Sequence, residues 1–246
     1  MTKDEFFTGI QDYFRNLVAE NDLDGSEISV MSSALTPEEA IGITKRKDYP
    51  ILDGHEIMLQ AEYRGSVGQA FTAAPAAFNG SLDEIIEGDI ENDDYARSIF
   101  FAALNAVLRY LGKIDHTIHC KNDGPELCAK QYAEYIKVKY GNPKILQVGF
   151  QPALFQELAA NFEMKILDLS PDNIGRTMYG VTIGDGIKDM DEAKKWADLI
   201  VCTGSTVSNG SVTDYLDIDK QVIFYGTSFA CGDAIFGIDR PCFESK

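Results

Sequence analysis

A loop rich in hydroxyl side chains follows an apolar segment in the C-terminal half. Residues 198–202 predict a buried strand, and the next eight residues are Thr-Gly-Ser-Thr-Val-Ser-Asn-Gly. In open α/β sheets, ligands bind beyond the carboxyl ends of the parallel strands, and successive backbone N–H groups in such a loop can hold an anion. A helix cap at Ser211 would need only one such residue. We therefore expect a ligand-binding loop, formed by Thr203, Gly204, Ser205, Thr206, Asn209 and Gly210.

A second candidate combines a glycine turn with a carboxylate. Gly149 directly follows the predicted strand 144–148, and Asp168 lies near the end of the next predicted strand, 164–169. That is the place of the ribose-binding carboxylate in a dinucleotide fold. The turn continues as Phe-Gln-Pro-Ala-Leu and lacks the second glycine of G-x-G-x-x-G. Ligand binding at Gly149, Phe150 and Asp168 and a plain strand–turn–helix connection both stay open.

A third candidate gathers imidazoles and thiols. His116, His119, Cys120 and Cys128 fall within 13 residues, and these side chains suit zinc and other transition metals. The spacing matches no standard zinc module. The alternative is a linker in which the two cysteines pack as small hydrophobic residues.

Two further places carry weaker signals. Gly226 and Thr227 follow the predicted strand 221–225 and are expected beside the hydroxyl-rich loop. His55 is either a general base or a turn residue. The chain holds no G-x-S-x-G, H-E-x-x-H or Walker A motif, so no established catalytic motif stands out.

The elements that must position these residues change character along the chain. In the C-terminal half, apolar strands at 144–148, 164–169, 198–202 and 221–225 alternate with helices at 152–162, 189–196 and 211–216. This alternation predicts a Rossmann-like parallel sheet that is covered on both faces.

The N-terminal half predicts a mixed α+β domain. Helices are expected from Thr2, from Thr36, from Ser81 and over 93–111, with strands at 27–35, 56–63 and 67–72. The predicted fold class is α/β. The predicted organisation is an α+β domain over residues 1–112, a linker or helix over 113–140 and the parallel-sheet domain over 141–246.

The charge and the cysteine content restrict which binding partners and which cellular compartment are expected. The 39 acidic and 22 basic residues give a net charge of −17, which disfavours nucleic acid and anionic membranes. Five cysteines and a charged start without a signal-peptide pattern predict a cytoplasmic protein with free thiols or a metal site. Homo-oligomerisation stays open.

Several segments together resemble a known family. Residues 203–210, after the Ala-Asp-Leu-Ile-Val strand, resemble the T-G-[ST]-T-x-x-N-[GT] segment of the heavy-metal chelation family, a domain of unknown function. Further similar pieces occur in the same order over nearly the whole chain: residues 68–72, 80–85, 103–106 and 148–150.

The resemblance implies an enolase-N-terminal-like domain followed by a Rossmann-like domain, with a ligand site in the cleft between them. It implies cleft roles for Asn105, Gly149, Asp168 and the loop Thr203–Gly210. One departure lies at Gly226-Thr227-Ser228, where relatives often have Gly-Pro-[ST].

Three classes of function follow from these features. The leading hypothesis is a protein that binds a metal ion or a metal-bearing small molecule in the cleft. The second is an enzyme that uses a nucleotide-like cofactor, such as S-adenosylmethionine, on the edge of the sheet. The third is a regulatory or interaction module with a vestigial cleft.

Overall fold

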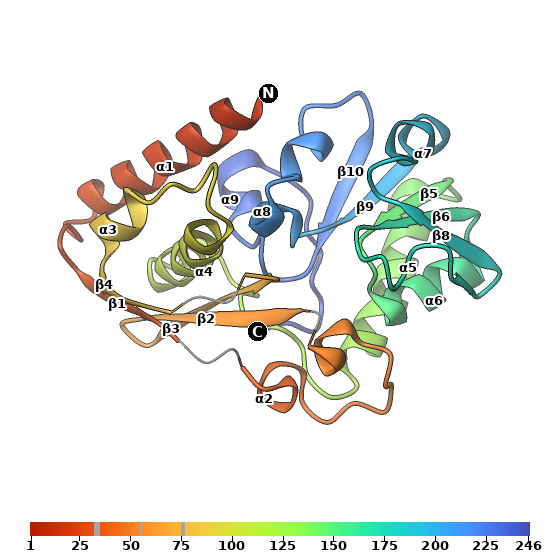
Figure 1. Cartoon of the computed structure of the whole chain (residues 1–246), viewed down its shortest axis with the longest axis horizontal. Coiled ribbons are helices and arrows are strands. Elements are labelled where there is room, and N and C mark those ends of the chain that lie inside the picture. Colours follow the sequence, from red (N-terminus) through yellow and green to blue (C-terminus); the bar gives the residue numbers. More distant parts are fainter. Residues whose placement is uncertain (32–34, 55, 75–76) are drawn as a thin grey trace.

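The computed structural model describes residues 1–31, 35–54, 56–74 and 77–246, and it contains two β-sheets flanked by helices (Figure 1). One sheet is antiparallel and belongs to the N-terminal half, and the other is mostly parallel and belongs to the C-terminal half. The predicted α/β fold class is confirmed. Among the described residues, no helix combines the length and the apolar character that crossing a membrane requires.

The antiparallel sheet has the strand order β3-β2-β1-β4. Helices α1 and α4 lie on one of its faces (Figure 1). The elements of this half are α1 (Lys3–Glu20), β1 (Glu27–Val30), α2 (Pro37–Ile41), η1 (Pro50–Asp53), β2 (Ile57–Tyr63), β3 (Ser66–Thr72), β4 (Phe78–Ser81), α3 (Leu82–Ile86) and α4 (Asp94–Tyr110).

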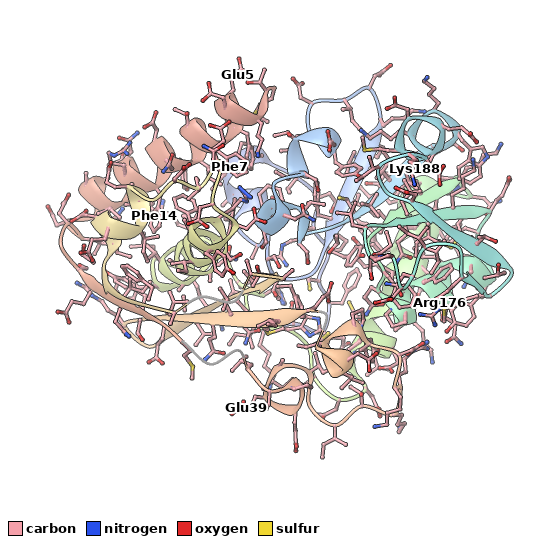
Figure 2. The ribbon with its side chains drawn as sticks, in the orientation of Figure 1. Glu5, Phe7, Phe14, Glu39, Arg176 and Lys188 are labelled. Atoms are coloured by element: carbon pink, nitrogen blue, oxygen red, sulfur yellow. The ribbon has the colours of Figure 1, made fainter. Side chains whose placement is uncertain are left out.

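Local sequence explains these helices. The predicted capping box at Thr2 is present, because its hydroxyl accepts from the Glu5 N–H and the Glu5 carboxylate accepts from the Thr2 N–H. Phe7 and Phe14 point from α1 toward α4, whereas Glu5 points outward (Figure 2). Helix α4 is buried along most of its length, as its nearly all-round apolar sequence predicts.

One glycine sets how closely β3 approaches α4. A Cβ atom at Gly68 would lie 2.3 Å from the Ala102 carbonyl oxygen and 2.4 Å from the Ala106 nitrogen. Only glycine permits this backbone-to-backbone approach. The helix is therefore seated directly on the sheet.

The C-terminal half carries the parallel sheet. Helices α5 and α6 cover one face and α7 covers the other (Figure 1). Its elements are α5 (Gly124–Tyr140), β5 (Ile145–Val148), α6 (Pro152–Asn161), β6 (Met164–Asp168), β7 (Thr177–Met178), β8 (Val181–Asp185), α7 (Met190–Trp196), β9 (Leu199–Thr203), α8 (Thr206–Asn209), η2 (Val212–Tyr215), β10 (Gln221–Tyr225) and α9 (Gly232–Phe236).

The strand order β10-β9-β5-β6-β8-β7 creates a switch point between β5 and β9. From β5 the chain first winds outward through β6 and β8, and then returns to the other side of β5 to form β9 and β10. The five parallel strands thus have the order 3-2-1-4-5 of a doubly wound sheet. Ligand crevices in such sheets open at the switch point, beyond the carboxyl ends of the strands.

The hydrophobic cores join the two halves. One core combines α1 and α4 with sheet residues such as Leu146 and Cys202, and the other combines Ile41 and Met58 with residues of α5 and α6. Neighbouring residues in a strand point to opposite faces of the sheet, so they pack into different cores, as buried parallel strands require. The predicted domain boundaries stay a prediction.

Some expected elements differ in the structure. The helix predicted at 211–216 is the short η2, and it follows α8, which lies inside the segment predicted to be a loop. Strands β4, β7 and β8 and helix α9 were not predicted. Strand β7 has only two residues, so it leaves no alternation of apolar and polar residues to detect.

Candidate functional site

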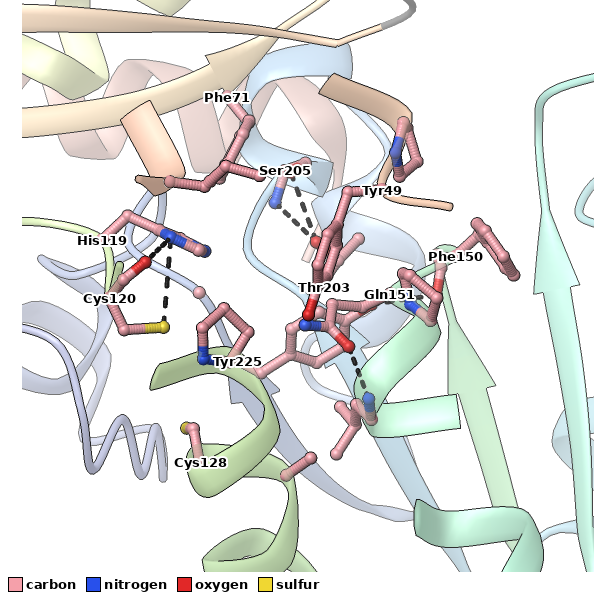
Figure 3. Close-up of a pocket in the computed structure, with 18 of the residues that line it drawn as sticks. Tyr49, Phe71, His119, Cys120, Cys128, Phe150, Gln151, Thr203, Ser205 and Tyr225 are labelled. Carbon is pink, nitrogen blue, oxygen red and sulfur yellow. Dashed lines mark hydrogen bonds between the residues drawn. The ribbon is translucent and has the colours of Figure 1, made fainter. Parts of the chain in front are cut away.

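A cleft of about 850 Å³ lies along the carboxyl edge of the parallel sheet. The ends of β5, β6 and β9 form one wall through Val148, Asp168 and Thr203, and the N-terminal half supplies the facing wall, which includes Glu56 and Asp94. Figure 3 shows a smaller space of about 100 Å³, here called the inner cavity. It adjoins the cleft, because Glu56 and Thr203 line both. The cleft lies at the switch point, as expected for this strand order.

Gly149 allows the turn after β5 to lie close to β9 at the switch point. It has a φ of +87°, and a Cβ atom there would lie 2.6 Å from Cγ2 of Thr203. The Tyr225 hydroxyl lies 3.0 Å from the Val148 carbonyl oxygen and 2.9 Å from that of Gly149. A glycine is therefore required where β5 turns beside β9.

Asp168 holds the glycine turn in place. Its Oδ2 accepts from the Phe150 N–H at 2.8 Å, and its Oδ1 accepts from the Ser170 N–H at 2.8 Å and from Nδ2 of Asn173 at 3.1 Å. Asp168 and Phe150 line the cleft, and their contact with a ligand stays a prediction. Three protein donors nevertheless occupy the carboxylate, so less of its accepting capacity is left for a ribose hydroxyl.

The N-terminus of α6 offers few donors to a phosphate. Pro152, at its first position, has no N–H, and the Gln151 side chain accepts from the Leu154 N–H. These are the groups that would bind an anion at a helix N-terminus. The missing second glycine of the fingerprint and this cap both weigh against a pyrophosphate.

The hydroxyl-rich loop is partly folded onto itself. The Thr203 hydroxyl accepts from the Ser205 N–H at 3.2 Å, and the Thr206 hydroxyl donates to the Thr203 carbonyl at 2.8 Å. Ser208 Oγ is buried without a hydrogen-bond partner among the described residues, and it lines the cleft. The loop thus presents Thr203, Ser205, Thr206, Ser208 and Asn209 to the cleft.

Four residues predicted to bind the ligand lie outside the cleft and the inner cavity. Gly204, Gly210 and Thr227 belong to neither lining, although Gly226 lines the inner cavity. Asn105 is fully buried, and its amide donates to the Ser228 carbonyl at 3.0 Å and accepts from the Cys231 N–H at 2.9 Å. Asn105 therefore clamps α4 to the loop after β10, and its contact with a ligand stays a prediction.

Glu56 is a cleft residue that sequence reasoning missed. It lies one residue before β2, lines both the cleft and the inner cavity, and has no hydrogen-bond partner among the described residues. Burial, together with the negative charge of Asp168, raises its pKa to about 7. No local pattern marks this residue, because its environment is created by β5 and β6, far away in the chain. The neighbouring candidate His55 lies outside the described residues.

The lining of the cleft is predominantly acidic. Among the described residues that line it, seven carry carboxylates and two carry a positive charge. They are Asp48, Asp53, Glu56, Asp94, Asp168, Asp172 and Asp214, against Lys47 and Arg176. Such a lining favours cationic over anionic ligands.

The predicted metal ligands do not converge on one point. His116 Nδ1 lies 2.8 Å from the Ser245 carbonyl, whereas His119 and Cys120 line the inner cavity with Cys128 (Figure 3). Burial lowers the pKa of His119 and raises that of Cys120. Within the described part of the chain, no three His, Cys, Asp or Glu side chains are grouped so that they could hold one metal ion.

Comparisons with known proteins give no function. No family model matches the chain, and no curated protein matches it. Its fold is similar to those of two DUF364 family proteins of unknown function. For the one from Pyrococcus horikoshii the identity is 15% and the TM-score 0.48, covering 89% of this chain and 76% of that one.

The second similar structure comes from Desulfitobacterium hafniense DCB-2. Its identity is also 15% and its TM-score 0.48, and the match covers 74% of this chain and 73% of that one. Both proteins are themselves of unknown function. The function of this chain must therefore be argued from its own site.

Proposed function

We propose that this chain is a cytoplasmic protein that binds a metal ion, or a small molecule that carries one, in the cleft at the switch point. The observation that carries the proposal is the excess of carboxylates in the lining. One of them is Glu56, which has no hydrogen-bond partner among the described residues. A positive ligand charge near such carboxylates is stabilised more strongly in a cleft than in water, because the surroundings screen it less.

The second part of the proposal concerns how the metal ion is carried. The described residues provide no group of three side chains suited to hold a bare ion. A metal complex brings most of its own ligands, and it needs only hydrogen-bond acceptors and negative charge from the protein. Glu56, Ser205 and Ser208 offer such groups on opposite walls of the cleft. A small metal complex therefore fits the cleft better than a bare ion does.

A nucleotide-like cofactor such as S-adenosylmethionine is the alternative that the strand order favours. The groups that would bind it are partly occupied, because Asp168 accepts from three protein donors and Gln151 caps α6. Its sulfonium would suit the acidic lining, so the experiment must compare both ligand types directly.

Isothermal titration calorimetry tests the proposal with hexaamminecobalt(III), an inert cationic metal complex. We expect saturable binding to the wild-type protein and about tenfold weaker binding to Glu56→Gln. Glu62→Gln is the matched control, because Glu62 is exposed on β2 and its substitution removes the same charge. If the two variants bind equally, or if only S-adenosylmethionine binds, the proposal is wrong.

A further inference from the structure

The inner cavity has walls that suit an uncharged ring. They are mostly apolar and come from both halves of the chain, with Ile51 and Phe71 from the N-terminal half and Tyr132 and Phe150 from the C-terminal half. Apolar walls with a few polar groups are typical of small-molecule sites. An apolar cavity of about 150 Å³ holds benzene. The inner cavity, at about 100 Å³, therefore favours a smaller ring.

Several hydrogen-bonding groups in these walls are already engaged. The Tyr132 hydroxyl donates to the Phe224 carbonyl at 2.7 Å, and the Ser228 hydroxyl accepts from the Phe71 N–H at 2.8 Å. The Tyr225 hydroxyl lies within hydrogen-bond distance of the two backbone carbonyls where β5 ends. A ligand in the cavity must therefore be recognised by the groups that remain.

His119 keeps one acceptor available to the cavity. Its Nδ1 lies 2.7 Å from the Cys120 carbonyl, which can only accept, so Nδ1 carries the proton and Nε2 carries a lone pair. Among the described residues, nothing donates to this Nε2. Figure 3 shows the His119 ring extending from the side of Cys120 toward the middle of the cavity. Burial lowers the pKa of His119, so the lone pair persists at neutral pH.

Contacts on several sides fix the orientation of this ring. Phe71 meets it edge to face, with 5.3 Å between the ring centres and 88° between the ring planes. The backbone N–H of His119 donates to Oε1 of the buried Gln69 at 2.8 Å, and the bond from Nδ1 holds the other side. The acceptor is therefore in place before a ligand arrives, which lowers the entropic cost of binding.

A metal ion is a poor match for this nitrogen. The Cys120 sulfur lies on the Nδ1 side of the ring, 4.0 Å from that nitrogen. The described residues also provide no group of three side chains that could hold one ion. A single imidazole lone pair among apolar walls suits an uncharged N–H donor better than a charge, which would lose its hydration there.

We propose that the inner cavity is a second binding site, which takes a five-membered aromatic ring whose N–H group donates to Nε2 of His119. The apolar walls cover the carbon atoms of the ring, and the single hydrogen bond sets its orientation. This site goes beyond the cation site of the cleft and does not depend on which ligand the cleft binds.

Pyrrole and furan are matched probes for this site, because both are five-membered aromatic rings and only pyrrole has an N–H donor. NMR titration of the ¹⁵N-labelled full chain measures their binding. We expect both to bind saturably, with pyrrole about fivefold tighter. In long-range proton–nitrogen spectra, the Nε2 signal of His119 should move as pyrrole saturates the site. The signals of His116, which lines neither the cleft nor the inner cavity, should stay in place.

Two histidine variants test the acceptor. His119→Phe keeps a ring but removes the acceptor, so it should bind pyrrole and furan equally. His116→Phe is the matched control, because it also removes an imidazole whose Nδ1 contacts a backbone carbonyl, but outside the cavity. It should keep the fivefold preference for pyrrole.

The proposal is overturned if pyrrole binds the wild-type protein no tighter than furan. It is also overturned if the Nε2 signal of His119 stays in place at saturation, which would assign the N–H to another acceptor, such as Glu56. Both readings come from the wild-type protein, so a variant that folds poorly does not leave the question open. Neither probe carries a charge, so the result is separate from that of the cation titration.

Discussion

Glu56 is the residue whose chemistry differs most from that of an ordinary surface carboxylate. It lines the cleft without a hydrogen-bond donor among the described residues, and Asp168 faces it. A carboxylate in such a place is stabilised in its neutral form. A bound cation would favour the charged form instead. Ligand binding should therefore be coupled to the loss of the Glu56 proton.

The first prediction concerns the pH dependence of stability. The folded-state pKa of Glu56, about 7, exceeds the ordinary value of 4.5. Its contribution to stability is therefore fully present below about pH 4.5 and is lost as the pH rises through 7. Glu56→Gln has no proton to lose, so it should unfold like the wild type at about pH 4.5. At about pH 8 it should be more stable, by about 2 kcal/mol.

Urea unfolding at both pH values measures this difference. Glu62→Gln, which changes an exposed carboxylate on β2, should show no such pH dependence. A Glu56→Gln variant that is less stable than the wild type at about pH 8 would show that the carboxylate is stabilised there in its charged form.

For single residues, the sequence predicts the positions whose role is visible in the neighbouring residues. Gly149 and Asp168 were expected in the cleft because a glycine turn and a strand end are visible in the sequence, and both line it. Glu56 carries no local signature, since its neighbours come from distant segments. The sequence cannot tell which role Asn105 has, because an amide buried between elements and an amide aimed at a ligand look alike in a sequence.

The second prediction concerns the turn between β5 and α6. Gly149→Ala should destabilise the protein by about 3 kcal/mol, because the residue must keep a positive φ and its Cβ would meet Thr203. Gly237→Ala is the matched control, because its φ of +63° lies in the left-handed region and the new atom meets open space. It should cost only about 1 kcal/mol.

Thermal and urea unfolding measure both variants. Adding Thr203→Ser to Gly149→Ala removes the methyl group that lies nearest, so it should recover part of the loss. If both glycine variants lose the same unfolding free energy, the close approach of β5 and β9 does not restrict the residue at position 149.

The third prediction concerns the clamp between α4 and the loop after β10. Asn105→Ala leaves the Cys231 N–H without its acceptor in a fully buried place, so it should cost about 3 kcal/mol. Asn92→Ala, an exposed change just before the same helix, should cost less than about 0.5 kcal/mol. Urea unfolding of the two variants distinguishes these values. A small cost for Asn105→Ala would contradict its role as a clamp.

Helices and strands with a strong pattern of apolar residues are predicted well from the sequence. Elements in which this pattern is weak are not. The parallel strands β5, β6, β9 and β10 are apolar runs that only a sheet covered on both faces would bury. Strand β8 lacks that signature, because only Ile183 is fully buried within it. Helix α8 was predicted as loop because its Thr-Val-Ser-Asn sequence is typical of turns.

At the scale of the molecule, the function depends on how the two halves meet. Each hydrophobic core draws residues from both halves, so the two walls of the cleft are held in fixed relation by continuous packing. The sequence predicted a site between two units, but the composition of the facing wall could not be predicted. That wall supplies Glu56 and Asp94, two of the seven carboxylates among the described residues that line the cleft.

The central claim is that the cleft binds a cationic metal complex, and anomalous scattering locates such a complex directly. We predict that crystals grown with hexaamminecobalt(III) show a cobalt peak inside the cleft, with its ammine ligands donating to Glu56 and to groups of the 203–209 loop. Cobalt peaks found only on the outer surface, with the cleft empty at saturating concentration, would contradict the account.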